Sequence, residues 1–222
     1  KEDKPEITDG GIGYMLRRLV ALRAKTAREG VLLAGKLVER FGYIDSGRTY
    51  IICDPDEGWL FAVINGKRWI AQRVADDQVA MVANTYTIRQ IDLADTTRFL
   101  GSKDIIEYAK SRGWYDPQKD GAFDFASVYA NPISARSLSN LGRQADGLRY
   151  VSAKPIRTPE KLPFSVAPRH KISVADLMQV LRHDKEQANA APSSANPPDI
   201  GCPICSGATQ TSFVAQLRRD MP

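Results

Sequence analysis

The chain has 222 residues, of which 43% are hydrophobic and 26% are charged, and its net charge is +5. This composition is that of an ordinary globular protein with enough apolar residues for a sizeable core, in one large domain or two small ones. No apolar run approaches the roughly 20 residues that cross a bilayer, and the charged N-terminal stretch KEDKPEITDGG lacks the apolar region of a signal peptide.

The basic balance, with a pI of about 9.1, invites comparison with nucleic-acid-binding proteins. The basic residues are scattered, however, and mostly stand beside acidic ones, as in Lys103-Asp104 and Lys119-Asp120. Since no block of lysines and arginines forms a stripe for phosphates, we expect no nucleic-acid partner. The three cysteines are too few for a disulfide scaffold and leave at least one thiol unpaired, so the cellular compartment stays open.

The first predicted elements are two helices within residues 11–41. The i, i+3, i+4, i+7 spacing of an apolar helix face is followed by Ile12, Met15, Leu16 and Leu19. T-A-R-E is a capping box, in which the side chain of Glu29 can reach back to the amide of Thr26. A second helix should therefore begin near residue 26 and end before Gly42.

From residue 48 the hydrophobic pattern changes to the period of two that β-strands show. Four segments rich in β-branched and aromatic residues follow one another: RTYIIC, WLFAVI, RWIAQRV and QVAMVANTY. Short turns such as Asn65-Gly66 separate them, so we expect a four-stranded antiparallel meander. Both alternating sets of side chains in WLFAVI are apolar, whereas a sheet with one wet face alternates apolar with polar residues. We therefore expect this sheet to be covered on both faces, by helices.

The second half of the sequence predicts further helices separated by irregular stretches. SKDIIEYAKSRG, with Ser102 as N-cap, and SVADLMQVLRHD, with a capping box from Ser173 to Asp176, are both expected to be helical. Residues 131–168, rich in Pro, Ser and Arg, are expected to be irregular. EQANAAPSSANPPD has the composition of a flexible loop, and TSFVAQL that of one more strand.

Several stretches together carry a family resemblance. They are TAREG (26–30), DPDEGW (54–59), AQRVADDQVAMVANTYTIRQID (71–92), FLGSKDIIEYAKSRGWYDPQKDGAFDFASVYA (99–130), LPFSVAPRHKISVADLMQVLRHD (162–184) and TQTSFVAQLRRDMP (209–222). In this order they resemble the dipeptidase family of cysteine N-terminal-nucleophile (Ntn) hydrolases. That family is related to the secernins and, more distantly, to penicillin acylases and bile salt hydrolases.

The resemblance implies a fold and a reaction. The fold is a four-layer αββα sandwich, an α+β architecture of antiparallel sheets flanked by helices, to which residues 1–222 would contribute one domain with a flexible loop at 186–201. The reaction is hydrolysis of short peptides, mainly dipeptides, through an acyl-enzyme on an N-terminal cysteine. That single residue supplies both a thiolate nucleophile and an α-amine as proton acceptor, so no histidine, metal or cofactor is expected.

The sequence departs from the family at the nucleophile. Family members carry that cysteine at the mature N-terminus, upstream of anything present here, whereas this chain begins with Lys1. We therefore expect an internal portion of a longer dipeptidase, inactive as the 222-residue chain alone. The alternative is a non-catalytic, secernin-like member that binds peptides or proteins. The dipeptidase would take short peptides or dipeptides as substrates. We expect no membrane as a partner, and a homo-oligomer is compatible with the sequence.

Two residues stand out as candidates for the catalytic site. Asn84 resembles the strand-end asparagine with which the related acylases hold the oxyanion, where one donor is worth about 3–4 kcal/mol. Its alternative role is to cap the turn before Thr85. Arg143, followed four residues later by Gly147, stands where the family has an arginine near the nucleophile, which could lower the thiol pKa or bind a carboxylate. Its alternative is an ordinary surface arginine.

The remaining candidates have simpler explanations. Cys53, at a strand-to-turn junction, would be a nucleophile only after cleavage before it, and we expect a small buried residue instead. The acidic turn at 54–57 could bind a cation or a substrate amine, or be ordinary loop chemistry. Cys202 and Cys205 have metal or redox spacing, but one pair supplies only two of the four ligands of structural zinc. We expect structural thiols or one disulfide there, and no metal.

Overall fold

The computed structural model describes residues 11–45, 47–156, 162–184 and 203–220. The chain divides into two compact units. Unit 1 consists of Lys1–Val74 and Asn84–Ala135, and unit 2 of Ala75–Ala83 and Arg136–Pro222. Each contains helices and a sheet of antiparallel strands, which confirms the α+β class. That residues 1–222 act as one domain stays a prediction, and the predicted flexible loop at 186–201 lies outside the described residues.

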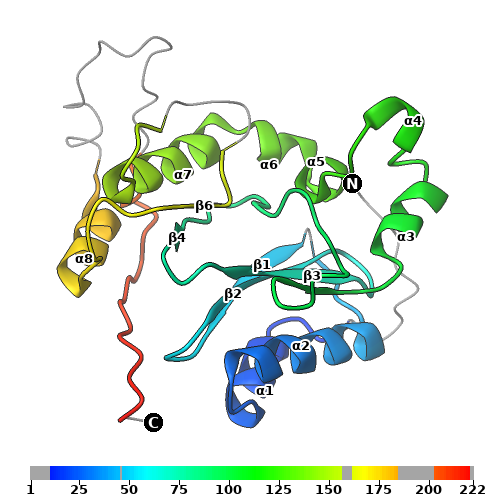
Figure 1. Ribbon diagram of the computed structural model, residues 1–222, viewed down its shortest axis with the longest axis horizontal. Coiled ribbons are helices and arrows are strands. Elements are labelled where there is room, and N and C mark those ends of the chain that lie inside the picture. Colours follow the sequence, from blue (N-terminus) through cyan, green and yellow to red (C-terminus); the bar gives the residue numbers. More distant parts are fainter. Residues whose placement is uncertain (1–10, 46, 157–161, 185–202, 221–222) are drawn as a thin grey trace. The chain divides into compact units, whose positions relative to one another are not determined.

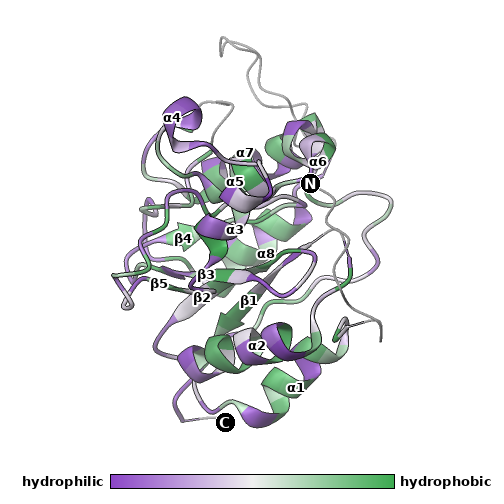
Figure 2. Cartoon of the chain, turned by 90° about the vertical axis from the view of Figure 1, so that its right-hand side faces the viewer, coloured by the Kyte–Doolittle hydropathy of each residue, from purple (hydrophilic) through white to green (hydrophobic). Residues whose placement is uncertain are grey.

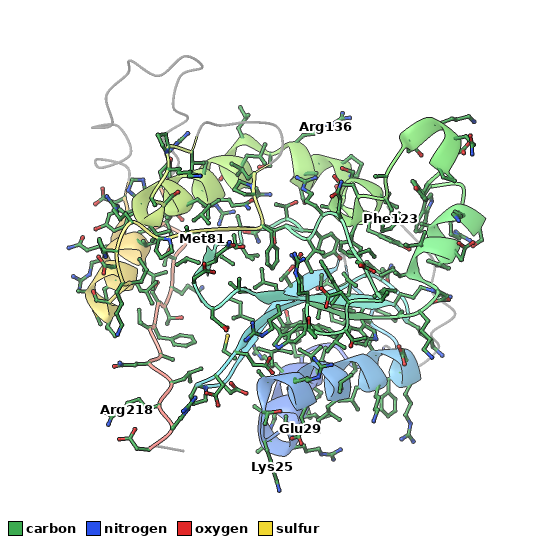
Figure 3. All side chains as sticks on the ribbon, in the orientation of Figure 1. Lys25, Glu29, Met81, Phe123, Arg136 and Arg218 are labelled. Carbon is green, nitrogen blue, oxygen red and sulfur yellow. The ribbon has the colours of Figure 1, made fainter. Side chains whose placement is uncertain are left out.

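Unit 1 begins with the two predicted helices, α1 (Met15–Arg23) and α2 (Ala27–Phe41). The hydroxyl of Thr26 caps α2 by accepting the N–H of Glu29 at 3.2 Å. The carboxylate of Glu29 accepts the amide of Lys25 at 2.9 Å rather than that of Thr26, so the reciprocal half of the capping box is displaced by one residue. Figure 3 labels Lys25 and Glu29 at this end of α2. At the other end the chain leaves the helix through Gly42, whose φ of 76° suits glycine.

Four strands form the sheet of unit 1 in the order β1 (Arg48–Cys53), β2 (Gly58–Val63), β3 (Trp69–Val74) and β5 (Phe99–Gly101). The first three are the predicted antiparallel meander. The prediction for the fourth was wrong, because β5 occupies the edge of β3. Gly101 permits this close pairing, since a Cβ there would lie 2.7 Å from the Cδ1 atom of Ile70. Within QVAMVANTY only β4 (Val79–Ala80) is a strand, and it belongs to unit 2.

The sheet is covered on both faces over its central strand, as predicted. On one face α1 and α2 build a core that includes Leu16, Val31, Val38, Trp59, Phe61 and Val63. Leu60 and Ala62, which alternate with these residues along β2, are buried as well. The helices α3 (Ile105–Ser111) and α5 (Phe125–Tyr129) lie on the opposite side of the sheet from α1 and α2 (Figure 1, Figure 2). Unit 1 also contains α4 (Pro117–Asp120) and most of α6 (Pro132–Arg136).

Unit 2 is built on two helices, α7 (Leu138–Val151) and α8 (Val174–Arg182). Their core includes Ala145, Leu148, Val151, Leu162, Val166 and Val180. The expectation of an irregular segment at 131–168 was wrong over α7, where the apolar residues recur at helical spacing and Ser137 caps the first turn. The capping box at the start of α8 is present as predicted. The short strands β4 and β6 (Ser165–Val166) pair antiparallel.

Two smaller predictions were also wrong. The helix α3 begins after Asp104 rather than at Ser102, because the Ser102 hydroxyl instead accepts the backbone N–H of Trp69 at 3.2 Å and so ties this turn to β3. In the described structure, the segment TSFVAQL is not a strand of either sheet.

Candidate functional site

Two of the sequence motifs that carry the resemblance meet at the start of α2. The Asp54 carboxylate accepts the N–H of Ala27 through Oδ2 at 2.6 Å. The Glu57 carboxylate accepts the N–H of Arg28 through Oε1 at 3.1 Å. The first N–H groups of a helix have no partner within the helix, and negative charge there is favourable. The segment DPDEGW therefore supplies the carboxylate acceptors for the first N–H groups of α2, which begins within TAREG.

The same carboxylates close the acidic turn itself. The Oδ1 atom of Asp54 accepts the N–H groups of Asp56 and Glu57, both at 2.8 Å. Burial alone would raise the pKa of Asp54, but the N–H donors of Ala27, Asp56 and Glu57 outweigh it and lower that pKa. Glu57 also pairs with Arg73 of β3 at 3.1 Å. Because both carboxylates are engaged by backbone N–H groups, the turn at 54–57 has a structural role at the start of α2.

Asn84 lies in a bend and is exposed. The premise that it ends a strand was wrong, because β4 stops at Ala80. The segment after it is fixed in unit 1: the Tyr86 hydroxyl donates to the carbonyl of Val63 at 2.6 Å, and the carbonyl of Ile88 accepts the N–H of Ala126 at 3.1 Å. Asn84 thus lies at the start of a well-anchored stretch. Its role in holding an oxyanion stays a prediction.

Arg143 lies on α7 and is partly buried. Its Nη2 atom donates to Oδ1 of Asn140 at 2.7 Å, and its Nε atom donates to the carbonyl of Ser139 at 3.3 Å. The guanidinium is therefore held in a defined orientation along the helix. Its catalytic role stays a prediction, and it belongs to unit 2, whereas Asn84 belongs to unit 1.

Gly147, four residues after Arg143, has a packing role in unit 2. A Cβ atom on Gly147 would run into the thioether side chain of Met81, which lies beside α7 (Figure 3). Glycine at this position lets the segment after β4 approach the helix backbone. The spacing of Arg143 and Gly147, read from the sequence as part of a site motif, is thus explained in part by close packing.

A polar group that the sequence analysis missed lies five residues after Asn84. The guanidinium of Arg89 pairs with Asp124 at 3.3 Å, and Asp124 also caps α5 by accepting the N–H of Ser127 at 3.0 Å. In the described part of the chain, the Nε atom of Arg89 and the hydroxyl of Thr87 are buried without a hydrogen-bond partner. The signal available in the sequence was the D-F-A-S cap, which predicts the helix start but not the arginine.

Cys53 does not have the setting of an activated nucleophile. Cys53 is exposed, so the expectation of a buried residue was wrong. Partial desolvation of its sulfur, assisted by the charge of Asp54, raises the pKa of the Cys53 thiol although the backbone of Trp59 opposes this. A raised pKa keeps the thiol protonated, the opposite of an activated cysteine. Cys205 is a partly buried free thiol, and Cys202 lies outside the described residues.

Among the described residues, no group of three or more His, Cys, Asp and Glu side chains could hold a metal ion. None of the described helices is long and apolar enough to span a membrane.

His183, at the end of α8, lies 3.5 Å from Asp146 of α7, which also pairs with Arg149. This approach is between α7 and α8, within unit 2.

Comparison with known proteins places these features in a family. The profile of peptidase family C69 matches residues 2–222. A probable dipeptidase of Salmonella dublin is 29% identical over 98% of this chain and 51% of its own length. A probable dipeptidase of Latilactobacillus sakei is 26% identical over 98% of this chain and 46% of its own length. A dipeptidase of Bifidobacterium longum is 30% identical over 82% of this chain and 37% of its own length. The chain thus spans about half the length, or less, of these relatives.

Proposed function

Since the chain belongs to peptidase family C69, we propose that it is a portion of a cysteine-type dipeptidase of the Ntn-hydrolase class. The observation that carries the proposal is the family match across residues 2–222, supported by relatives whose names include dipeptidase. We further propose that the two units contribute to a four-layer αββα sandwich. The substrates would be short peptides, chiefly dipeptides.

In this proposal the nucleophile is an N-terminal cysteine outside the 222 residues. Its thiolate attacks the carbonyl carbon of the peptide bond, and its own α-amine accepts the thiol proton and passes it to the departing amine. Asn84 donates a hydrogen bond to the oxyanion that forms at the carbonyl oxygen. Arg143 acts through charge, either on the thiolate or on the substrate carboxylate. Water then hydrolyses the thioester and regenerates the cysteine.

The first test is made on the product of the complete reading frame. Its N-terminal residue is determined by mass spectrometry, and release of free amino acids is measured over a panel of dipeptides. An N-terminal cysteine together with turnover supports the proposal, and residues 1–222 alone should be inactive. A product that lacks that cysteine and binds dipeptides without cleaving them would instead indicate a non-catalytic, secernin-like member.

The second test concerns Asn84. In the complete product, Asn84→Asp removes the amide donor at nearly constant size and should lower kcat by about 10²–10³. Gln90→Glu is the matched control, because it makes the same chemical change at an exposed position nearby. Equal activity of the two variants would reject the oxyanion role of Asn84 while leaving the dipeptidase assignment intact.

The third test concerns Arg143. If its charge favours the thiolate, Arg143→Gln should move the acidic limb of the pH profile of kcat/KM to higher pH, because the thiol pKa rises without the cation. Arg143→Lys should restore part of the shift. A profile that keeps its shape while KM rises would indicate instead that Arg143 binds the substrate carboxylate.

A further inference from the structure

The first turn of α7 contains a buried polar residue beside Arg143. Asn140 is 8% exposed, and its Oδ1 atom accepts a hydrogen bond from Nη2 of Arg143 at 2.7 Å. The two residues are three positions apart, a spacing at which side chains meet on one face of a helix. Arg143 also donates from Nε to the carbonyl of Ser139 at 3.3 Å. Asn140 therefore takes part in setting the orientation of the guanidinium.

The helix that carries this pair is firmly packed within unit 2. Leu148 belongs to the core of that unit, and Gly147 lies against the side chain of Met81. Gly147 is seven positions after Asn140 and so lies on the same face of α7. At the start of the helix, the hydroxyl of Ser137 accepts the N–H of Asn140 at 3.4 Å. The position of Asn140 is thus set by a capped helix whose packing lies inside one unit.

Two other helices of the chain carry an acid at the position that Asn140 occupies. The third residue after the Ser or Thr cap is Glu29 in α2 and Asp176 in α8. In α7 that residue is Asn140, and the first turn of α7 contains no acidic residue. A carboxylate there would gain from the positive end of the helix and from a charge-assisted hydrogen bond with Arg143. An asparagine forgoes both contributions to stability.

A neutral partner has a consequence for the charge of Arg143. A carboxylate 2.7 Å from the guanidinium would offset much of its electrostatic effect on any third group nearby. The amide oxygen of Asn140 makes the same hydrogen bond without adding negative charge. Residues that lower stability where a better alternative exists are typical of functional sites. The choice of asparagine therefore favours a role in the reaction.

We propose that Asn140 is a positioning residue for Arg143: its amide oxygen orients the guanidinium and leaves the positive charge available to the reaction. This role rests on the proposed function, in which Arg143 acts through its charge on the thiolate or on the substrate carboxylate. A carboxylate in place of Asn140 would hold the guanidinium as firmly but weaken its action on either group.

The test compares Asn140→Asp with Arg143→Gln in the product of the complete reading frame, and both should change the same kinetic parameter. If Arg143→Gln moves the acidic limb of the pH profile of kcat/KM to higher pH by about one unit, Asn140→Asp should move it in the same direction by at least about half as much. If Arg143→Gln instead raises KM, Asn140→Asp should raise KM by at least about threefold.

Ser137→Asp is the matched control. It adds the same charge at the same end of α7 and remains a good helix cap, but it lies six residues, or about 9 Å along the helix axis, from Arg143. It should leave the acidic limb and KM as in the wild type. Asn140→Ala is the second variant, for the case that Asn140→Asp does not fold. It should lower kcat/KM by about tenfold, because the guanidinium loses part of its orientation.

Three results would overturn the role of Asn140. Asn140→Asp could keep the wild-type limb and KM although Arg143→Gln changes one of them. Ser137→Asp could cause the same change as Asn140→Asp, which would indicate a general effect of negative charge on unit 2. Asn140→Ala could keep the wild-type kcat/KM. Failure of the proposed function has a different signature, namely no turnover by the wild-type product or no effect of Arg143→Gln, and the role of Asn140 would fall with it.

Discussion

Replacing Asp54 by alanine should destabilise the chain far more than an ordinary surface change. One carboxylate accepts three backbone N–H groups, those of Ala27, Asp56 and Glu57. Loss of the acceptor at the start of α2 costs about 1 kcal/mol by analogy with helix caps. Loss of the two bonds that close the turn costs about 0.5 kcal/mol each, the low end for partly exposed groups. The sum of about 2 kcal/mol corresponds to a fall in Tm of about 4–8 °C for a protein of this size.

The assay is urea and thermal unfolding followed by circular dichroism. Asp54→Asn keeps one acceptor oxygen and should cost about half as much, and Asp77→Ala, in an exposed turn, should cost less than about 0.5 kcal/mol. Since the folded pKa of Asp54 lies below its ordinary value of 3.8, the charge stabilises the fold above that value. The gap between wild type and Asp54→Asn should stay constant from about pH 7 to about pH 5 and shrink as the pH falls below 3.8. A gap that persists unchanged in acid, or Asp54→Ala within 0.5 kcal/mol of wild type, would refute the reasoning.

Two further predictions concern the core of unit 1. Tyr86→Phe removes the buried hydrogen bond to the carbonyl of Val63 and should lower the free energy of unfolding by about 1–2 kcal/mol, measured in urea; no change would mean that water replaces the hydroxyl. Gly35→Ala should destabilise α2 although alanine favours helices by about 1 kcal/mol, because the new Cβ would clash with the rigid indole of Trp69; a raised Tm would contradict this packing.

Elements governed by local sequence were predictable. The break between α1 and α2 and the start of α8 follow from side-chain caps, which act over three or four residues. The first three strands follow from alternation and short turns. The helix α7 was missed because Ser139, Asn140 and the two glycines of its sequence lower helix propensity. The apolar stripe through Ala145 and Leu148 is stabilised by packing that sequence alone does not show.

Partners distant in sequence were not predictable from local patterns. QVAMVANTY has the residues of a strand, yet β5 pairs with β3, where Gly101 lies close to Ile70. This pairing joins segments that are about thirty residues apart, which local patterns do not show. The structural role of the acidic turn follows from its hydrogen bonds with the N–H groups of Ala27 and Arg28, which are distant in sequence. Asn84 was identified by resemblance, but its setting in an exposed bend depended on where β4 ended.

The junction of DPDEGW with the start of α2 bears on how the family is recognised. The carboxylates of Asp54 and Glu57 accept backbone N–H groups that hold the start of α2 and the acidic turn in place. They would be needed equally by a member that cleaves peptides and by one that does not. A search built on these two motifs therefore gathers proteins that share a scaffold, and activity among them has to be judged at the cysteine, on separate grounds.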